Sequence, residues 1–237
     1  MFKRSLLFAA FLAAVLTAQA APPIIIIALP YSITAPGTYV LQSNLTDPVP
    51  NSTAIFISTT LSGPVVLDFK GHTITGPGLG TAPGFSSRGV VLEGGSNNLY
   101  PITIRNGTLS NFGIGVSAVG GEEIGKTDVT INSIVFNLVS LDVGGNPGNS
   151  FPSYGVLFQG ALGCSVTNCT FNSVWDSIGI VTYGIADIDA MGPNTYNNNT
   201  FNNTWVPLTI SLFFDEGIAS LGINCQTSAA KTSLPKP

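Results

Sequence analysis

Five side chains in the middle of the chain have chemical types that bind small polar ligands. They lie in or beside three short segments in which apolar and polar residues alternate, and they are Arg88, Glu93, Ser117, Tyr154 and Gln159. Charged and amide groups hydrogen-bond to hydroxyls, and an aromatic ring stacks on the apolar face of a sugar. If the three segments lie side by side, these residues predict a carbohydrate-binding cleft, although the pattern assigns no catalytic residue.

Two long insertions flank this group of residues. One occupies 75–88 and the other 137–153, while the repeat between them has almost no insertion at the same point. Two projecting loops around a missing loop would leave a notch about two strand spacings wide, roughly 10 Å, which admits one extended polymer. The alternative is that both loops are passive connections, because their content of Gly and Pro suits solvent-exposed turns equally well.

A second group of polar residues lies in the segment YGIADIDAMGPN. Alternation would place Asp187 and Asp189 on one side of an extended segment, with Asn194 nearby. Carboxylate and amide oxygens bind Ca²⁺, so the two aspartates are weak candidates for a Ca²⁺ site, and no other cofactor is expected. Because Ca²⁺ takes about six to eight oxygens, a solvated return loop explains the pair better.

Two tryptophans and one short basic segment offer weaker candidates. Trp175 and Trp205 occupy matching places in neighbouring repeats. They would form either a platform for sugar rings or a cover over the core. His72, the only histidine, stands in KGHTITG and is interpreted as a turn residue. Lys70 and Arg105 are predicted at equivalent outward positions, where they would contact an acidic ligand or form a solvated ion pair.

The first twenty residues have the features of a secretory signal peptide. A basic start is followed by an apolar run over 6–16 and by the small residues Ala18 and Ala20 around the expected cleavage site. No apolar run is long enough to span a bilayer. We therefore expect a secreted or periplasmic chain that begins at Ala21 and has no transmembrane segment.

The composition limits the partners of the exported chain. Charged residues make up 8% of the sequence, and acidic residues outnumber basic ones by 12 to 8. A nucleic acid partner requires clustered Lys and Arg, so none is expected. Cys164, Cys169 and Cys225 permit one disulfide and one thiol, or three small buried side chains.

An apolar pair with a five-residue separation recurs along the chain. The pairs are Val40/Leu45, Phe69/Ile74, Ile104/Leu109, Ile131/Phe136, Val166/Phe171 and Tyr196/Phe201. In all but the first pair, Gly, Ser or Asn stands two places after the first member, and these residues tolerate the backbone of a tight turn. The pattern predicts repeated strand–turn–strand units, with Phe136, Phe171 and Phe201 in one interior column.

A third predicted strand follows each pair. The six segments are AIFIS (54–58), GVVLE (89–93), GIGVS (113–117), GVLFQ (155–159), SIGIV (177–181) and PLTIS (207–211). Alternation predicts the inward residues Ile55/Ile57, Val90/Leu92, Ile114/Val116, Val156/Phe158, Ile178/Ile180 and Leu208/Ile210. One unit cannot bury its apolar side alone, so the units are expected to stack as three parallel sheets around one core.

Three stretches of these repeats resemble right-handed parallel β-helix repeat proteins. They are VVLDFKGHTITGPG (65–78), ITIRNGTLSNFGIGV (102–116) and VTNCTFNS (166–173). That superfamily includes pectate lyases, polygalacturonases and NosD-like periplasmic proteins. The resemblance implies an all-β, single-stranded right-handed parallel β-helix of about six coils over 38–215. Residues 21–37 would cap the helix, and 216–237 would form a C-terminal cap and a loose tail.

The catalytic and metal-binding residues of these families are only partly present in this sequence. A polygalacturonase would need clustered aspartates and a Gly-His-Gly turn, but Thr73 follows Gly71-His72. A NosD-like role in copper maturation would require clusters of His, Met or Cys. We therefore expect an elongated polar surface that binds polysaccharide. Two alternatives stay open: a lyase or glycoside hydrolase acting on acidic polysaccharide, and a structural surface or assembly protein.

Overall fold

Alternating apolar and polar residues, with Thr and Val frequent at the outward positions, make the chain fold as short parallel strands. The computed structural model describes residues 21–58, 60–78, 87–93, 100–119, 128–139, 153–174, 182–188, 193–202 and 208–210. Every regular element in these ranges is a strand. None of the described residues forms a helix long and apolar enough to cross a membrane. The all-β prediction is therefore confirmed for the part of the chain that the structure describes.

Within the described ranges the strands form two parallel sheets, named sheet A and sheet B. Sheet A contains β1 (Ile24–Ile26), β3 (Gly37–Leu41), β4 (Leu45–Thr46), β6 (Val65–Asp68), β7 (Thr73–Thr75), β9 (Ile102–Phe112), β11 (Val129–Val139), β13 (Ser165–Thr167), β14 (Thr170–Val174), β16 (Thr195–Asn197) and β17 (Thr200–Asn202). Sheet B contains β2 (Tyr31–Ile33), β5 (Thr53–Ser58), β8 (Arg88–Glu93), β10 (Ile114–Val119), β12 (Ser153–Gln159), β15 (Thr182–Ile188) and β18 (Leu208–Ile210).

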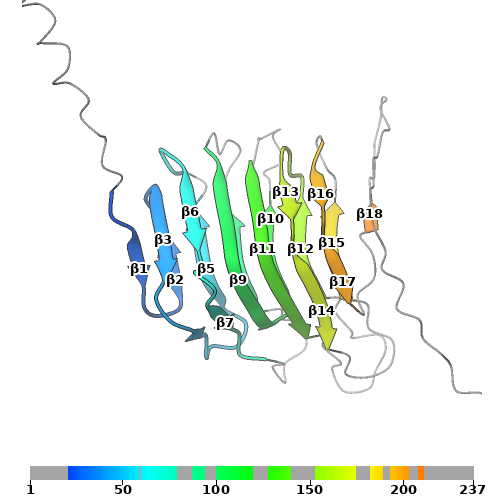
Figure 1. Ribbon diagram of the computed structural model, residues 1–237, viewed down its shortest axis with the longest axis horizontal. Helices are drawn as coiled ribbons and strands as arrows, with labels where there is room; N and C mark the ends of the chain where they lie inside the picture. The colour runs from blue at the N-terminus through cyan, green and yellow to red at the C-terminus, as the bar shows by residue number, and fades with distance from the viewer. Residues whose placement is uncertain are drawn as a thin grey trace, which may run out of the picture.

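The chain runs through sheet A and then sheet B repeatedly, and we number these passes from the one that begins with β3. Each strand pairs with its equivalent in the next pass. Figure 1 shows the result as strands of sheet A side by side in sequence order. The expected capping segment 21–37 contributes β1, which pairs with β3, and β2, which pairs with β5. This segment thus adds one strand to the end of each sheet.

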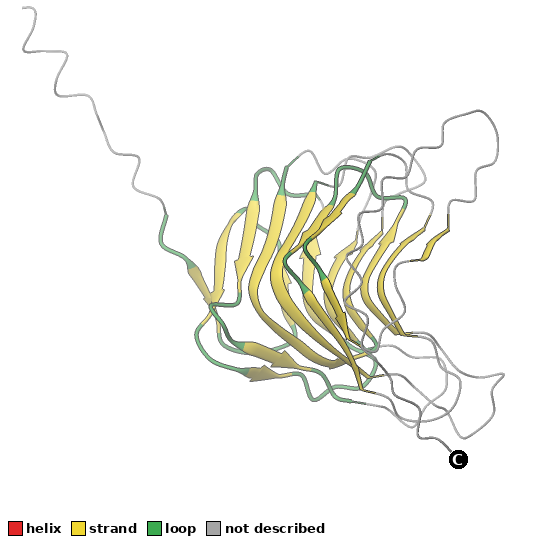
Figure 2. Cartoon of the chain, turned by 45° about the vertical axis from the view of Figure 1, so that its right-hand side comes forward, coloured by secondary structure: helices red, strands yellow, loops and turns green. Residues whose placement is uncertain are grey.

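The first two strands of each repeat belong to one bent sheet, and not to two sheets as expected. In the central passes β9 and β11 run without interruption through the corner, and Figure 2 shows how strongly they curve. Asn106 and Ser133 make the corner with φ of 59° and 56°, and Asn168 and Asn198 make it with φ of 54° and 55°. The predicted tight turns are therefore confirmed, but they bend sheet A instead of ending it.

The aromatic column predicted from the repeats is confirmed in sheet A. Phe136 stacks on Phe171 with ring centroids 4.8 Å apart and an interplanar angle of 1°, and Phe171 stacks on Phe201 at 5.0 Å and 7°. The register continues the column through smaller apolar residues in the order Leu45, Ile74, Leu109, Phe136, Phe171 and Phe201. Every second member of the expected apolar pairs is therefore correctly placed.

The first members of the first two pairs were wrong. The register aligns Tyr39, Leu67, Ile104, Ile131, Val166 and Tyr196, so Tyr39 and Leu67 take the places expected for Val40 and Phe69. The first two passes have longer corners, which the constant five-residue step could not reveal. Phe69 is still fully buried, because it packs where a side chain at Gly107 would lie, 2.2 Å from the position of an added Cβ.

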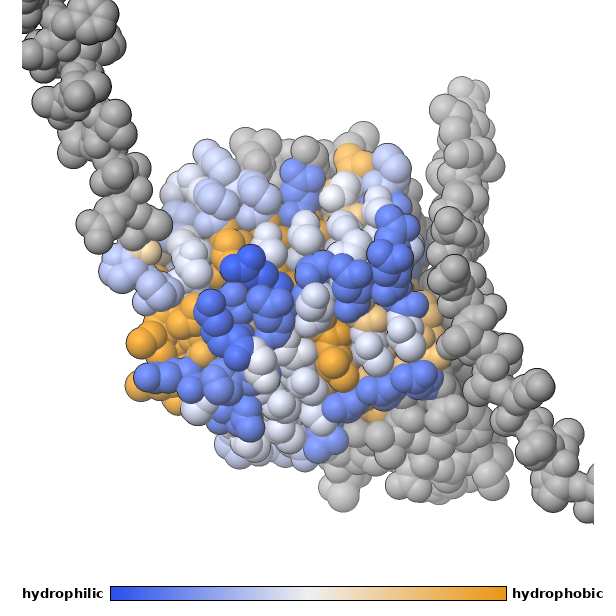
Figure 3. Space-filling model, viewed as in Figure 1, coloured by the Kyte–Doolittle hydropathy of each residue, from blue (hydrophilic) through white to orange (hydrophobic). Residues whose placement is uncertain are grey.

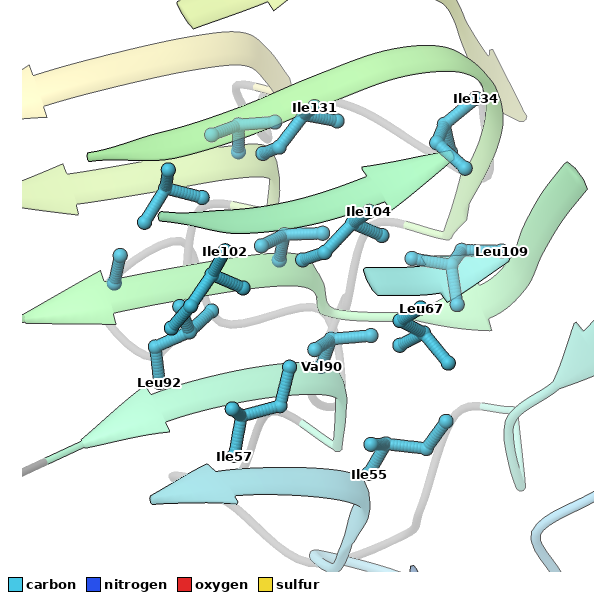
Figure 4. Close-up of a cluster of buried hydrophobic side chains, with 14 of the residues drawn as sticks. Ile55, Ile57, Leu67, Val90, Leu92, Ile102, Ile104, Leu109, Ile131 and Ile134 are labelled. Atoms are coloured by element: carbon cyan, nitrogen blue, oxygen red, sulfur yellow. The ribbon is translucent and has the colours of Figure 1, made fainter. Parts of the chain in front are cut away.

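A row of small residues in sheet B faces the aromatic column. The register aligns Ala54, Gly89, Gly115, Gly155 and Gly184. A Cβ added at Gly115 would lie 2.5 Å from Phe136, one at Gly155 would lie 2.4 Å from Phe171, and one at Gly184 would lie 2.4 Å from Phe201. The rings of sheet A therefore pack directly on the bare backbone of sheet B. Aliphatic side chains such as Ile104, Ile131 and Val90 fill the adjoining interior (Figure 4).

The alignment of the glycines also shows that the third strand of the third pass has a different register from the expected one. Because Gly115, and not Gly113, aligns with Gly89 and Gly155, the pass is shifted by two residues from the expected register. Val116 faces the core as expected and Ala118 is its inward partner, while Ile114, which is also buried, aligns with Arg88 and Tyr154. Ser117 consequently lies beside Val91 and Leu157 and shares no row with Glu93 or Gln159.

The fifth pass enters sheet B later than expected. Its strand is β15, in which Ile185 belongs to the core cluster and Asp187 aligns with Phe158. The segment 177–181, with Ile178 and Ile180, lies outside the residues that the structure describes. In β18 the register places Thr209, and neither Leu208 nor Ile210, in the row of Asp187. The missed signal is Tyr183-Gly184-Ile185, which repeats Tyr154-Gly155-Val156.

Gly155→Ala tests the packing of rings on backbone. The new methyl group would collide with Phe171 and with the Gly184 carbonyl, so we expect the free energy of unfolding to fall by about 1–3 kcal/mol. Adding Phe171→Leu should make the double variant less destabilised than the sum of the two single changes, because the methyl then has room. Urea denaturation measures the values, and Thr170→Ala on the outer face should change stability by about 0.5 kcal/mol or less. Strict additivity would contradict the proposed contact.

Candidate functional site

The five residues first considered as a cleft fall in three separate rows of sheet B. Arg88 and Tyr154 share a row but are separated by Ile114, and Glu93 and Gln159 share another but are separated by Val119. Gln159 is exposed and Arg88 half-buried, while the side chain of Glu93 lies outside the described part.

Tyr154 is held by a neighbour on the next strand. Its half-buried ring stacks on Tyr183 with centroids 5.5 Å apart, and burial together with Tyr183 raises the pKa of its hydroxyl.

Ser117 cannot form the floor of a cleft, because it is buried with 2% of its surface exposed. Its neighbours in the same row, Val91 and Ala186, are also buried. Ser117 itself is therefore covered, whereas Leu157 beside it in the same row is partly exposed, and the cleft as a whole stays a prediction. The flanking loops at 79–86 and 140–152, and both tryptophans, lie outside the residues that the structure describes.

A larger polar surface covers the outer side of sheet A, and we name it the polar face. Its outward side chains align in four rows that cross the strands. The first row contains Thr38, Val66, Thr103, Thr130, Ser165 and Thr195, and the second contains Val40, Asp68, Arg105, Asn132, Thr167 and Asn197. The third row contains Thr73, Thr108, Val135, Thr170 and Thr200, and the fourth contains Thr46, Thr75, Ser110, Asn137, Asn172 and Asn202.

The corner residues divide the polar face into two halves of different chemistry. The first two rows precede the corner and include the charged Asp68 and Arg105, whereas the described rows after the corner contain only uncharged side chains. White and blue colours, which mark neutral and hydrophilic residues, cover most of the described surface on this side (Figure 3). Hydrophobic colour gathers at the end formed by β1, where Ile24, Ile25 and Ile27 are exposed.

Hydrogen bonds along the fourth row fix its asparagines, which we name the asparagine ladder. Asn202 donates from Nδ2 to Oδ1 of Asn172 over 2.8 Å, and Asn172 donates in the same way to Asn137 over 2.8 Å. An amide has two N–H donors and two acceptor lone pairs, so Asn172 retains one donor and one acceptor site after both bonds. In the second row, Asn132 similarly donates to Thr167 over 2.7 Å.

Asp68 is the structural centre of the charged part of the polar face. Its side chain is 2% exposed, and it accepts bonds from the Lys70 amide at 2.9 Å, Arg105 Nε at 3.0 Å and Asn106 Nδ2 at 3.3 Å. Burial alone would raise the pKa of Asp68, but these bonds and the charges of Arg105 and Lys70 outweigh burial and lower the pKa. The side chains of Lys70 and Arg105 remain 58% and 44% exposed.

Lys70 and Arg105 are not equivalent, contrary to the sequence alignment. Arg105 pairs with Asp68 in the register, while Lys70 lies in the corner with a φ of 53°. His72 is half-buried beside this corner, and its amide donates to the Phe69 carbonyl over 2.8 Å. The expected turn at KGHT is therefore confirmed, and the basic side chains gather around one buried carboxylate.

Asp187 lies in the interior and not in a solvated return loop, which corrects the expectation. It is 4% exposed, and its Oδ2 accepts bonds from the Tyr196 hydroxyl at 2.6 Å and Asn194 Nδ2 at 2.9 Å. Its Oδ1 has no hydrogen-bond partner. Burial, followed by the charge of Asp187, raises the pKa of Tyr196, so the phenol keeps the proton that it donates.

The described part of the chain contains few side chains placed together that could bind a metal ion. Asp187 is the described member of the expected Ca²⁺ pair, and Asp189 lies outside the described ranges. No group of three or more His, Cys, Asp or Glu that could hold a metal occurs among the residues searched, which are the described ones. Cys164 and Cys169 are buried thiols, and burial raises the pKa of Cys169 to about 11, which disfavours the reactive thiolate. Cys225 lies outside the described part.

Sequence reasoning missed the polar face, although a signal for it was present. Thr, Ser or Asn recurs on both sides of the inward residues, as in Thr103 and Arg105 around Ile104 or Thr108 and Ser110 around Leu109. Those residue types also occur in turns, and the spacing of apolar residues indicates only the inward side of each strand. The outward rows become visible once the strand register is known.

Comparison with protein-family models, curated protein sequences and solved structures gives no match for this chain. The parallel all-β architecture is compatible with the β-helix proteins that the repeats resemble. A fold of this kind accommodates many activities, so function has to be inferred from the side chains themselves.

Asp68→Asn tests the buried carboxylate through the pH dependence of stability. A lowered pKa means that ionised Asp68 stabilises the fold above its unfolded pKa near 3.8, and that this stabilisation is lost as the pH falls through the lower folded value. We expect wild type to be more stable than the variant at pH 6 and the difference to shrink below about pH 4. Urea denaturation between pH 6 and pH 2 measures this, and a difference independent of pH would refute the assignment.

Tyr196→Phe tests the buried Asp187 cluster. Removing the hydroxyl deprives a buried carboxylate of a donor, so we expect a loss of about 1–3 kcal/mol in the free energy of unfolding. The double variant Asp187→Leu with Tyr196→Phe should recover most of that loss, because both polar partners are replaced by apolar groups. Thermal and urea unfolding measure both variants. A double variant as unstable as the sum of its parts would contradict this account.

Proposed function

We propose that the chain is a right-handed parallel β-helix of about six coils whose polar face binds an extended polysaccharide. Each pass through sheets A and B would be one coil, over 38–215. Parallel pairing of every strand with its equivalent in the next pass supports this arrangement. We also propose that residues 1–20 direct the chain to secretion or the periplasm and that 216–237 form the C-terminal cap and tail, ranges that lie outside the described residues.

The observation that carries the proposal is the repetition of polar side chains across the strands of sheet A. Each row presents a side-chain donor or acceptor at most of its strands, at intervals of about 4.8 Å, and valine interrupts three of the four rows. A polymer of repeating sugars presents its hydroxyls at intervals in the same manner. Many weak contacts along one molecule then act together, because each bound unit holds the next unit close to its own site.

The polar face is a better surface for this purpose than the outer side of sheet B. In the middle of sheet B, Ser117, Val91 and Ala186 are buried, and the partly exposed Leu157 in the same row is apolar. On sheet A, outward residues such as Thr130, Thr170 and Asn172 are partly exposed on successive passes. Their exposure supports a continuous contact surface along the stack.

Three of the described carboxylates are held by neighbouring groups and are poorly placed to contact a ligand. Asp47, Asp68 and Asp187 are all buried, and each accepts hydrogen bonds from neighbouring groups. Glycoside hydrolysis uses two carboxyl groups that flank the scissile bond and contact the substrate. These three residues instead hold corners and strands together, so the proposal assigns them structural roles.

Polysaccharide binding by the mature chain from residue 21 tests the proposal. We expect the wild type to bind at least one polymer on a glycan array, and Thr130→Arg with Thr108→Arg to weaken binding tenfold or more, about 1.4 kcal/mol, because bulky charged groups would obstruct the polar face. Gln159→Arg, on exposed sheet B, should change affinity less than twofold. Circular dichroism should confirm that all variants are folded. Absence of polysaccharide binding, or a loss caused by Gln159→Arg alone, would refute the proposal.

A further inference from the structure

We propose that the second half of the polar face selects a neutral, unbranched, β-linked polysaccharide that lies across the strands and contacts the asparagine ladder with about one sugar per strand. This inference rests on the proposed function and names the ligand class. Its physical basis is the combination of charge distribution, hydrogen-bond geometry and repeat length in the rows after the corner.

Charge distribution argues for a neutral ligand. The third and fourth rows contain Thr, Ser, Asn and one Val, and none of their described side chains is charged. An acidic polymer carries a charge on every unit and would require a cation at each strand. Lys70 and Arg105 lie at one place beside Asp68, and the later positions in the row of Arg105 are Asn132, Thr167 and Asn197. The cations therefore do not repeat along the stack.

The asparagine ladder has hydrogen-bonding capacity that matches sugar hydroxyls. Asn137, Asn172 and Asn202 are joined by two bonds of 2.8 Å that run in the same direction, from each amide nitrogen to the oxygen of the preceding pass. Asn172 uses one donor and one acceptor site in these bonds and keeps one of each. A hydroxyl both donates and accepts, so one hydroxyl can use both sites.

Fixed side chains also reduce the entropic cost of binding. An unrestrained amide side chain would lose rotamer freedom on contact with a ligand, whereas the ladder has already restricted Asn172 through its two bonds. The neighbouring third row contributes Thr170 and Thr200, whose β-branched side chains have few rotamers. A preorganised row suits a ligand that presents the same group many times.

The repeat length argues for an extended chain. Equivalent residues on adjacent strands are about 4.8 Å apart, which is comparable to the advance of one sugar in an extended β-linked polymer. Successive sugars of cellulose and chitin are related by about half a turn, so the same hydroxyl edge meets the row at every second strand. The axis of a coiled α-linked polymer instead curves away from a straight row.

Pull-down with insoluble polymers and affinity electrophoresis with soluble ones test this inference, using the full mature chain. The probes are cellulose and chitin as neutral β-linked polymers, amylose as a neutral α-linked polymer, and polygalacturonate as an acidic polymer. We expect binding to cellulose or chitin that changes less than twofold between 0.05 and 0.5 M NaCl, since charge is not used. Binding to amylose and polygalacturonate should be at least tenfold weaker.

Asn172→Leu removes both bonds of the central ladder residue and should weaken binding to the preferred polymer at least tenfold. Asn172→Thr retains a β-forming polar residue and provides a second variant if the leucine variant fails to fold; it should weaken binding at least threefold. Gln42→Leu removes an exposed amide between β3 and β4, outside the four rows, and should change binding less than twofold. Thermal unfolding monitors the folding of each variant.

The outcomes separate this inference from the proposed function. Binding confined to polygalacturonate and lost at high salt, or equal binding to amylose, would overturn the neutral β-linked class while leaving the polar face as a polysaccharide site. Unchanged binding by folded Asn172→Leu and Asn172→Thr would overturn the role of the ladder. Absence of binding to every polymer would refute the proposed function together with this inference.

Discussion

The contact between stacked phenylalanine rings and bare glycine backbone is the constraint on which the arrangement of the two sheets depends. Phe136, Phe171 and Phe201 form a column in sheet A, and Gly115, Gly155 and Gly184 leave the facing backbone of sheet B open to receive them. The rings can pack here only because these positions are glycine, since a methyl group at any of them would occupy the volume of a ring. Stacking at 4.8 and 5.0 Å matches the spacing of parallel strands, so the rings also favour the native register over a shifted one.

The same register decides what the outside of the molecule presents. Side chains alternate across a strand, and each inward column is therefore accompanied by outward rows on either side. Because β11, β14 and β17 pair in continuous register, Asn137, Asn172 and Asn202 come into hydrogen-bonding range. Threonines align on both sides of the corner, and the register of β9 with β11 shifts only after Asn137. The polar face is thus a consequence of core packing. A repeating surface of this kind suits a repeating ligand, which is the physical link between the interior of this chain and its proposed polysaccharide.

Two buried carboxylates, Asp68 and Asp187, are accommodated within the same arrangement of the two sheets. Asp68 is almost fully covered, but three donors and two cationic side chains surround it, and this environment favours its ionised form. Asp187 takes a place that the row of Phe158 would otherwise give to an apolar residue, and Tyr196 and Asn194 satisfy one of its two oxygens. The first carboxylate holds a corner of sheet A, whereas the second connects the two sheets through the core. Both are therefore part of the framework that supports the polar face.

The amino-acid sequence alone was sufficient for the all-β class, the tight turns at Asn106, Ser133, Asn168 and Asn198, and the Phe136, Phe171 and Phe201 column, because local turn chemistry and apolar spacing encode these features directly. It was insufficient for the register of β10, where the predicted segment began at Gly113 but the structure aligns Gly115 with Gly155. Only the packing of Phe136 against Gly115 distinguishes them, since that contact joins residues from different sheets. The burial of Ser117 and Asp187 and the alignment of the polar face were likewise decided by tertiary structure, because each depends on which strands become neighbours.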